Sequence, residues 1–374
     1  MHRVYLIPGF FGFANLGDFY YFGHLYDLLA DLFARRGQEC ALVRVRTRPT
    51  ASIRQRARAL AETIAASAGE DDGPIHLVGH STGGLDARLL LSPGVALGEG
   101  REFGFSLDRV QSLIAVATPH HGTPLASLFT GLQGQNLLRL LSLVTLYVLR
   151  FGQLPLGAVL RFGTLLLRTG GWVGLRQSLF DELFVQLLSD FSPERRQQVG
   201  AFLHDVSSDQ ALVLQLTPDA MDLFNASAVD RPGVAYGSLL TRGRKPGLGA
   251  RRTLGLAPQA QLTHSLYSLL HRQVGRMPAR LAPRADDQQR LRLERDLDAL
   301  PDRRDNDGIV PTLSQLWGRL LGAAEADHLD VIGHFGDGGH APQHVDWLAS
   351  GSAFDHQRFE ALWDEAVDFM LNAA

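Results

Sequence analysis

The chain has 374 residues, of which 45% are hydrophobic and 20% are charged, and its formal net charge is −3. This composition is typical of a globular protein rather than a disordered one. A nearly neutral chain gives no indication of binding to nucleic acid or to an acidic polymer. The length exceeds that of one simple core, so we expect one large domain that carries an inserted subdomain.

Cys40 is the single cysteine of the chain, which excludes an internal disulfide and a zinc site built from several cysteines. After Met1-His2-Arg3 the sequence enters an apolar run of only four residues, over 4–7. This run is shorter than the hydrophobic region of a secretory signal, and no small-residue cleavage site follows it. We therefore expect a cytoplasmic protein, although a secreted chain trimmed of its leader would look the same.

Short apolar runs alternate with segments of helical periodicity through the first third of the sequence. The expected strands are 4–7, 41–45, 75–78 and 113–117, and the expected helices between them are 25–36, 52–68 and 83–91. Such alternation favours a parallel sheet with helices on both faces.

A strongly apolar stretch over 137–167 follows. Arg139, Arg150 and Arg161 divide it into charge-free pieces of ten residues, whereas about twenty apolar residues are needed to cross a bilayer. Two interpretations remain open. The stretch forms helices packed on the core, or it forms a mobile lid whose apolar face covers a lipid site and contacts a lipid surface.

The last third of the chain returns to shorter elements. We expect, in chain order, a strand over 236–240, an exposed basic loop over 241–252, a polar surface excursion over 278–304, a helix over 312–321 and a terminal helix over 355–371.

A glycine-rich turn lies between an expected strand and an expected helix. Its sequence Gly79-His80-Ser81-Thr82-Gly83 matches the G-x-S-x-G pattern of a nucleophilic serine on a sharp turn. The helix that follows would direct free N–H groups at a developing oxyanion. We predict that Ser81 is the nucleophile rather than a structural serine, and that its neighbour His80 serves packing and is not the base.

An oxyanion hole needs two N–H donors. The backbone N–H of Thr82, directly after the nucleophile, is the first expected donor. The second usually comes from the loop after an early strand, and "LIPGFFGF" over 6–13 has that form. We predict that the Phe10 N–H is this donor, with an ordinary turn as the alternative.

The triad on this kind of fold runs in the order serine, acid, histidine. In "RRDNDGIVP", over 303–311, Asp307 precedes a glycine and an apolar pair. A turn of this kind can hold a carboxylate rigidly, so Asp307 is the predicted acid. Asp305 is its rival, Asp302 is a weaker one, and a purely structural turn is the remaining alternative.

The predicted base is His328, which lies 21 residues after the predicted acid, with the expected helix 312–321 between them. The acid would hold its imidazole in one tautomer and stabilise the imidazolium. The histidines that compete for this role are His334, His340, His344 and His356. Histidine spacings of six, six and four within 326–344 fit no zinc signature.

Several motifs in order along residues 4–335 resemble the bacterial triacylglycerol lipases of the Pseudomonas and Burkholderia type, in the α/β-hydrolase superfamily. The motifs are "LIPGFFGF" from Leu6, "DFYYFG" from Asp18, "HLVGHSTGGLDAR" from His76, "VATPHHGTPLA" from Val116, "NDGIVP" from Asn306 and "HLD" from His328. The resemblance implies an α/β-hydrolase fold, with a mostly parallel central sheet flanked by helices and a helical lid insertion. The implied division is core over 1–123, lid over 124–235 and core over 236–374.

The resemblance also implies site residues and an activity. Ser81, Asp307 and His328 fall on the family triad, and Phe10 and Thr82 fall on its oxyanion donors. The implied activity is carboxylic-ester hydrolysis of lipids such as acylglycerols, with 137–167 in transient contact with a lipid surface and no cofactor needed for the chemistry. An acyltransferase that uses the same acyl-enzyme and a non-catalytic lipid-binding protein remain alternatives.

A structural calcium site is implied as well, through Asp330 and an upstream acid for which Asp287 is the nearest match. Calcium prefers the carboxylate and carbonyl oxygens that such a site offers. Three features depart from the family pattern: its early His-Gly is Pro8-Gly9 here, its disulfide cannot form, and no leader is visible. Without that histidine, a hydrogen bond that would brace the oxyanion loop is missing.

Overall fold

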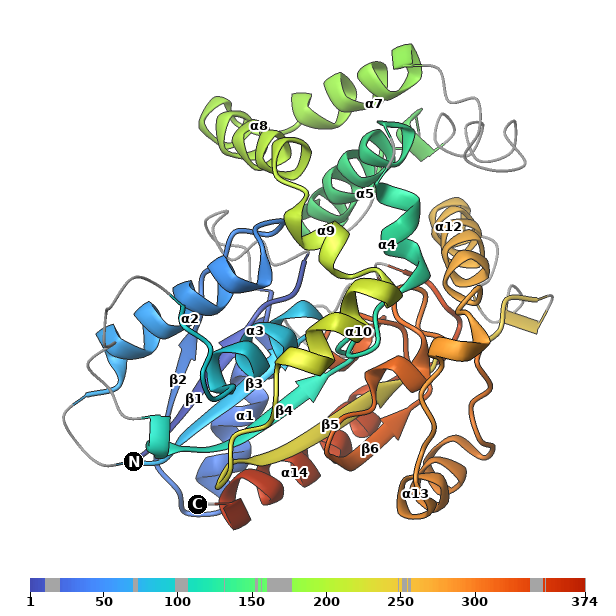
Figure 1. Cartoon of the computed structure of the whole chain (residues 1–374). Helices are drawn as coiled ribbons and strands as arrows, with labels where there is room; N and C mark the ends of the chain where they lie inside the picture. Colours follow the sequence, from blue (N-terminus) through green and yellow to red (C-terminus); the bar gives the residue numbers. More distant parts are fainter. Residues whose placement is uncertain are drawn as a thin grey trace.

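A six-stranded parallel sheet forms the centre of the molecule (Figure 1). The computed structural model describes residues 1–10, 21–69, 73–97, 107–130, 132–151, 154–155, 157–159, 177–247, 249–250, 254, 257–336, 346 and 348–373. The strand order is β2-β1-β3-β4-β5-β6. The strands are β1 (His2–Ile7), β2 (Cys40–Arg44), β3 (Ile75–His80), β4 (Val110–Val116), β5 (Ala235–Thr241) and β6 (Arg319–Ala324). The predicted parallel sheet is confirmed.

Helices cover both faces of the sheet, and the residues of β1 alternate between the two layers. Val4 and Leu6 pack in one buried cluster with α1 (Gly23–Arg35) and α14 (His356–Ala373). Tyr5 and Ile7 pack in another with α2 (Ile53–Ser67) and α3 (Thr82–Leu91). This period of two explains why apolar residues point to both sides of a central strand such as β1: each of its faces meets a helix layer.

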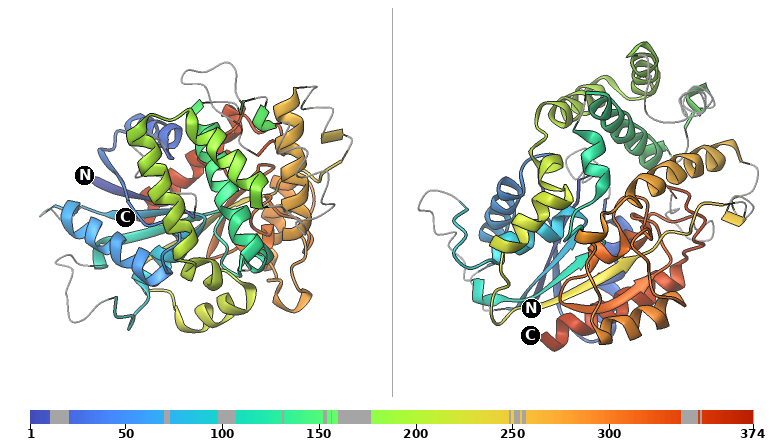
Figure 2. Two further views of the ribbon diagram at one scale, coloured as in Figure 1. Left: turned by 90° about the horizontal axis from the view of Figure 1, so that it is seen from above. Right: turned by 45° about the vertical axis from the view of Figure 1, so that its right-hand side comes forward.

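A group of helices lies between β4 and β5 in the sequence and stands at one end of the sheet (Figures 1 and 2). In the described part of the chain they are α4 (Pro124–Phe129), α5 (Leu132–Phe151), α7 (Gln177–Ser189), α8 (Pro193–Ser208), α9 (Ala211–Gln215) and α10 (Pro218–Ser227). Helix α5 packs against α4, α7 and α8 and buries a row of leucines in the main core. None of the described helices is both long and apolar enough to cross a membrane. Residues 152–153, 156 and 160–176 of the apolar stretch and its surroundings lie outside the described residues.

The 3-10 turn Leu107–Arg109 leads directly into β4. The remaining described elements follow β5 in the chain and are α12 (Pro258–Val274), α13 (Asp287–Leu297) and the 3-10 turns Ala279–Leu281, Thr312–Gln315 and Asp330–Ile332. Helix α13 lies inside the predicted polar excursion 278–304 and packs Leu293 and Leu297 against β6, while its other side is charged.

The prediction of a helix over 312–321 is wrong. This segment makes a short 3-10 turn over Thr312–Gln315, and β6 then begins at Arg319. Gly318, with φ +62, lies between them, and a Cβ there would stand 2.4 Å from the Tyr236 carbonyl oxygen. The left-handed backbone of Gly318 ends the turn. The apolar residues that follow are extended because they pair with β5, and the spacing of apolar residues in the sequence does not show this pairing.

We predict that Gly318→Ala destabilises the fold more than Gly37→Ala. Both glycines have positive φ, but a Cβ added at Gly37 would meet nothing within 4 Å, whereas one added at Gly318 would meet a backbone carbonyl. The left-handed backbone alone costs roughly 1–2 kcal/mol for alanine, and the steric clash should add to this only at Gly318. Urea unfolding of both variants measures the difference. Equal losses would contradict the crowding argument.

Candidate active site

The predicted nucleophile lies in a strained turn at the end of β3. Ser81 has φ 54 and ψ −127, directly before α3, a backbone conformation that a residue with a side chain adopts only under constraint. A Cβ on Gly79 would lie 2.4 Å from the Gly84 nitrogen, and one on Gly83 would lie 2.3 Å from the Ile7 carbonyl oxygen. Both glycines of the motif are therefore required by close backbone contacts.

The loop after β1 passes directly over this turn. A Cβ on Gly9 would lie 2.5 Å from the Cβ of Ser81. The next residue, Phe10, lines the same cavity as Ser81 and Thr82. Thr82 is the first residue of α3, where backbone N–H groups have no partner within the helix. The structure thus brings the two predicted oxyanion residues together around the predicted nucleophile.

A buried ion pair supports the loop after β1. Arg56 of α2 contacts Asp86 of α3 with a separation of 2.8 Å, and both side chains are fully buried. The same guanidinium donates to the Pro8 carbonyl oxygen at 2.7 Å and to the Arg48 carbonyl oxygen at 2.8 Å. Burial raises the pKa of Asp86 to about 6, and the adjacent Arg56 opposes that shift. Arg56 therefore joins two helices to the backbone of the loop after β1.

The predicted acid contacts the predicted base. The Nδ1 of His328 lies 2.7 Å from the Oδ2 of Asp307, and both side chains are almost completely buried. The same oxygen accepts hydrogen bonds from the Thr241 hydroxyl at 2.7 Å and the Gln315 amide at 3.2 Å. A carboxylate held in this way keeps the imidazole in one orientation and favours the tautomer with its free nitrogen Nε2 as a proton acceptor.

The turn after Asp307 satisfies the other carboxylate oxygen. Its Oδ1 accepts from the backbone N–H groups of Ile309 at 2.9 Å and Val310 at 2.7 Å. The rival Asp305 instead forms an ion pair with Lys245 at 2.9 Å. Asp305 therefore has a different partner, and Asp307 is the acid that faces His328.

His328 also contacts the turn that carries the nucleophile. Its carbonyl oxygen lies 2.8 Å from the Nε2 of His80, and the two rings are 4.8 Å apart. Its backbone N–H donates to the Asp307 carbonyl at 3.2 Å. The expectation that His80 serves packing alone is too simple, because this buried side chain connects the nucleophile turn with the backbone of the base.

An apolar cavity opens at Ser81. The empty space of about 560 Å³ between its walls includes open solvent at its mouth. Leu125 and Phe129 of α4 and Leu138 and Leu141 of α5 form much of its wall, so the insertion between β4 and β5 supplies the surface opposite the nucleophile. A cavity of this kind is suited to a hydrocarbon chain.

A group of carboxylates follows the base in sequence. One oxygen from each of Asp327, Asp330 and Asp346 lies within 4.8 Å of the others. Burial raises the pKa of all three, that of Asp346 to about 6. The Oδ2 of Asp327 and the Oδ1 of Asp346 are buried and have no hydrogen-bond partner among the described residues. Oxygen donors without partners fit a hard cation such as calcium. Asp287, exposed at the start of α13, is not part of this cluster.

The competing histidines lie elsewhere. His334 contacts the Tyr21 carbonyl through Nε2 at 2.9 Å, and His356 begins α14. His340 and His344 lie outside the described residues, as do residues 18–20 of the motif from Asp18.

The sequence did not reveal the polar residues that hold Asp307 and the loop after β1. Thr241 and Gln315 reach Asp307 from the end of β5 and from a 3-10 turn, and Arg56 reaches Pro8 from α2. A polar residue at the end of an apolar strand was one available signal for Thr241. An arginine within the alanine-rich helix of 52–68 gave none, since such residues are usually solvated.

Solved structures share this architecture. No protein-family model matches the sequence, and no curated protein does. Lipase 1 from Pelosinus fermentans matches with a TM-score of 0.52 and 17% identity, covering 98% of each chain. Staphylococcus hyicus lipase matches at 0.51 and 14%, covering 100% of this chain and 95% of that one. EstA from Clostridium botulinum matches at 0.50 and 20%, covering 94% and 86%. The chain therefore has the predicted α/β-hydrolase fold, and its neighbours are bacterial lipases and esterases.

We predict that Arg56→Met lowers the free energy of unfolding by about 3–5 kcal/mol, because it leaves the carboxylate of Asp86 buried without its partner. Arg58→Met on the same helix is the control. Arg58 pairs with Glu62 at the surface, where such a pair contributes only about 0.3–0.5 kcal/mol. Urea unfolding compares the two variants, and similar losses would show that the buried pair is dispensable.

Proposed function

We propose that the chain is a serine carboxylic-ester hydrolase that cleaves acyl esters of lipids such as acylglycerols. The observation that carries this proposal is the contact between Asp307 and His328, beside a strained serine turn that opens into an apolar cavity. The lipase and esterase names of the structural neighbours agree with it.

The proposed reaction has two halves. His328 accepts the Ser81 hydroxyl proton as the oxygen attacks the ester carbonyl carbon, and Asp307 stabilises the imidazolium. The N–H groups of Phe10 and Thr82 stabilise the oxyanion of the tetrahedral intermediate. The alcohol leaves with the proton from His328. Water then attacks the acyl-enzyme with His328 again as base, which releases the acid and restores Ser81.

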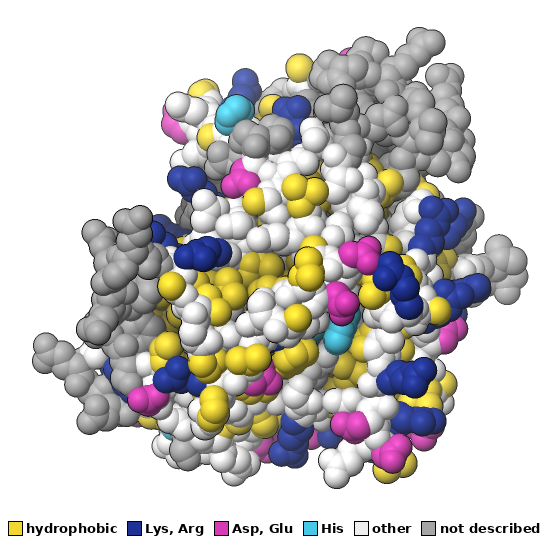
Figure 3. Space-filling view, viewed as in Figure 1, with side chains coloured by type: hydrophobic (Ala, Val, Ile, Leu, Met, Phe, Trp, Pro, Cys, Tyr) yellow, Lys and Arg dark blue, Asp and Glu magenta, His cyan; other side chains and the backbone are white. Residues whose placement is uncertain are grey.

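The apolar wall supports an acyl chain as the part of the substrate bound there. The cavity wall from α4 and α5 offers almost no polar group to a ligand, so a polar or charged acyl substituent would lose its hydration without compensation. Contact with a lipid surface through 137–167 belongs to the same proposal. Among the described residues of this stretch, the leucines of α5 are buried in the core and Phe151 is exposed, so this contact would be made at the end of α5. Leu214 of α9 and Leu223 of α10 are exposed hydrophobic residues of the same insertion. Hydrophobic and basic side chains are interspersed on the face of the molecule that Figure 3 shows.

Calcium is the second part of the proposal. The ion would be held by Asp327, Asp330 and Asp346. This set replaces the one that the sequence resemblance implies, in which Asp330 and Asp287 bind the ion together. Asp327 precedes His328 and Asp330 follows it closely, so a cation that neutralises these carboxylates would stiffen the segment that carries the base.

We predict that Ser81→Ala and His328→Ala abolish hydrolysis of p-nitrophenyl esters, and that Asp307→Asn lowers kcat by about 10⁴ because the imidazole loses its orientation. Asp305→Asn is the matched control and should retain most of the activity, as should His340→Ala and His344→Ala. A fluorophosphonate probe should label Ser81 of the unsubstituted chain. Hydrolysis that persists in purified Ser81→Ala would refute the assignment, and absence of labelling would favour a non-catalytic lipid-binding protein.

We predict that calcium raises the unfolding temperature of the chain and that excess EGTA reverses this. A ligand at 100 times its Kd contributes about 2.7 kcal/mol, and each kcal/mol shifts the midpoint by roughly 2–4 °C in a domain of this order of size. Asp327→Asn should remove the shift, since it deletes a carboxylate charge but keeps the Oδ1 that accepts from Leu329 and Asp330. Asp287→Asn should keep the shift. The opposite pattern would assign the ion to Asp287.

A further inference from the structure

The proposed site contains a chain of buried hydrogen bonds that involves neither the substrate nor the triad side chains. It begins at Gly9, whose N–H donates to the Tyr21 hydroxyl at 3.3 Å. The Tyr21 hydroxyl lies 2.6 Å from the Nδ1 of His80, and the Nε2 of His80 lies 2.8 Å from the His328 carbonyl oxygen. Tyr21 and His80 are both buried. The chain joins three segments: the loop after β1, the nucleophile turn and the segment of the base.

The direction of every bond in this chain follows from its last acceptor. A carbonyl oxygen only accepts, so the Nε2 of His80 carries the proton that points at His328. Burial lowers the pKa of His80 well below its usual value, so the ring is neutral and Nδ1 is an acceptor. The Tyr21 hydroxyl must then donate to Nδ1, and its oxygen remains free to accept from Gly9. Only this one placement of the protons gives every donor and acceptor of the chain of hydrogen bonds a partner.

The first end of the chain holds the peptide unit next to the proposed oxyanion donor. The Pro8 carbonyl and the Gly9 N–H belong to one peptide unit. Arg56 fixes its carbonyl, and Tyr21 fixes its N–H. The Phe10 N–H lies in the following peptide unit, which would rotate freely at Gly9 because glycine has a wide range of φ and ψ. Fixing the preceding unit anchors one side of Gly9, and the close approach of Ser81 to Gly9 restricts the rotation that remains.

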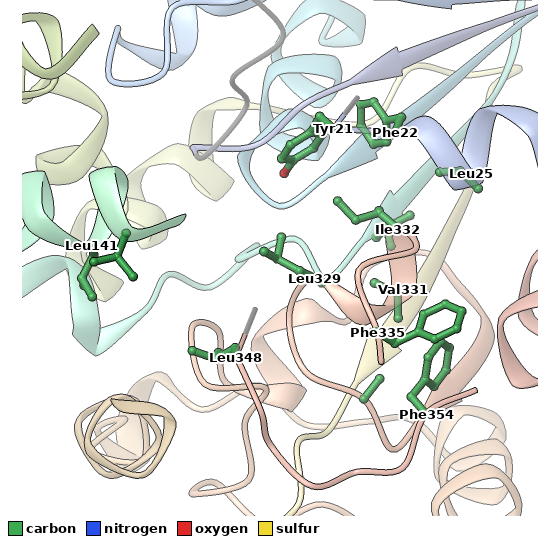
Figure 4. Packing of buried hydrophobic residues seen from close by; sticks show 14 of the residues in the cluster. Tyr21, Phe22, Leu25, Leu141, Leu329, Val331, Ile332, Phe335, Leu348 and Phe354 are labelled. Atoms are coloured by element: carbon green, nitrogen blue, oxygen red, sulfur yellow. The ribbon is translucent and has the colours of Figure 1, made fainter. Parts of the chain in front are cut away.

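The other end of the chain holds the backbone of the proposed base. The His328 N–H donates to the Asp307 carbonyl at 3.2 Å, and its carbonyl accepts from His80. The carbonyl oxygen of Tyr21 also accepts a hydrogen bond from the Nε2 of His334, in the same segment as His328, at 2.9 Å. In Figure 4, Tyr21 lies near Leu329 and Ile332 in the buried cluster. Tyr21 is thus attached to the base segment twice, directly and through His80.

We infer that Tyr21 and His80 are positioning residues that hold the oxyanion loop and the backbone of His328 in a fixed position relative to Ser81. This inference rests on the proposed hydrolase function. Reacting groups must be held to within a fraction of an ångström, and a displacement of about 1 Å can cost about a hundredfold in rate. Loss of the Tyr21 hydroxyl would break two of the three bonds of the chain at once, since Gly9 and His80 share it, and would leave the bond from His80 to His328 without a link to the loop after β1.

The test is steady-state hydrolysis of p-nitrophenyl butyrate, with thermal unfolding of each variant, at a temperature below every unfolding midpoint. Tyr21→Phe should lower kcat by about tenfold to a hundredfold and change KM by less than about twofold, because the lost interaction orients groups in the transition state. His80→Gln keeps an N–H donor toward His328 but lacks the acceptor at the Nδ1 position, and should show a similar loss. The double variant should lose little more than either single variant, since both remove the same bond.

Tyr5→Phe is the matched control. Tyr5 is another buried tyrosine, and its hydroxyl bonds to Ser67 at 3.1 Å on the α2 side of the sheet. The kcat of Tyr5→Phe should stay within about twofold of the kcat of the unsubstituted chain. The inference is overturned if Tyr21→Phe keeps its kcat, if it loses no more than Tyr5→Phe, or if the losses of the two single variants multiply in the double variant. Failure of the proposed function would give a different result. The unsubstituted chain would then be inactive, or Ser81→Ala would be as active as the unsubstituted chain.

Discussion

The close contact of three backbone segments around Ser81 is the constraint on which the rest of the site depends. The end of β1, the turn after β3 and the start of α3 approach so closely that a single Cβ at Gly79 or Gly83 would overlap backbone atoms. This packing forces the serine into a left-handed conformation and directs the start of α3 toward the same point. The strain is tolerated because strands on both sides of β3 hold its end in place.

Such a compact site buries many polar groups, and each of them needs a partner. The Pro8–Gly9 peptide unit is satisfied by Arg56 and Tyr21, and the Asp307 carboxylate by three side chains and two N–H groups. The side-chain partners come from several different elements of the fold. The same bonds that remove the cost of burial therefore also fix the relative positions of the groups that would react. The hydrogen bonds that stabilise the fold around Ser81 are thus the same bonds that hold its neighbouring groups in a fixed arrangement.

The sequence predicted the features that depend on local pattern. Strands of apolar residues, the helices between them and the Gly-x-Ser-x-Gly turn all leave short-range signals. The structure also brings Asp307, which the sequence singled out at its Asp-Gly turn, into contact with His328. The helix expected over 312–321 failed because pairing with β5 overrides helical spacing. The roles of Tyr21, His80 and Arg56 could not be read from the sequence, since each depends on contacts with residues that only the tertiary fold brings near.

The departure of Pro8-Gly9 from the related pattern takes on a different meaning in this structure. A proline at that position has no N–H to donate and supplies no polar side chain, so the loop needs support from outside itself. Arg56 and Tyr21 supply it at the two polar groups of the next peptide unit. The part of the cavity wall that comes from α4 and α5 of the insertion, by contrast, carries no part of this support. Changes in that part of the wall can therefore alter which groups fit the cavity while Ser81, His328 and Asp307 keep their geometry.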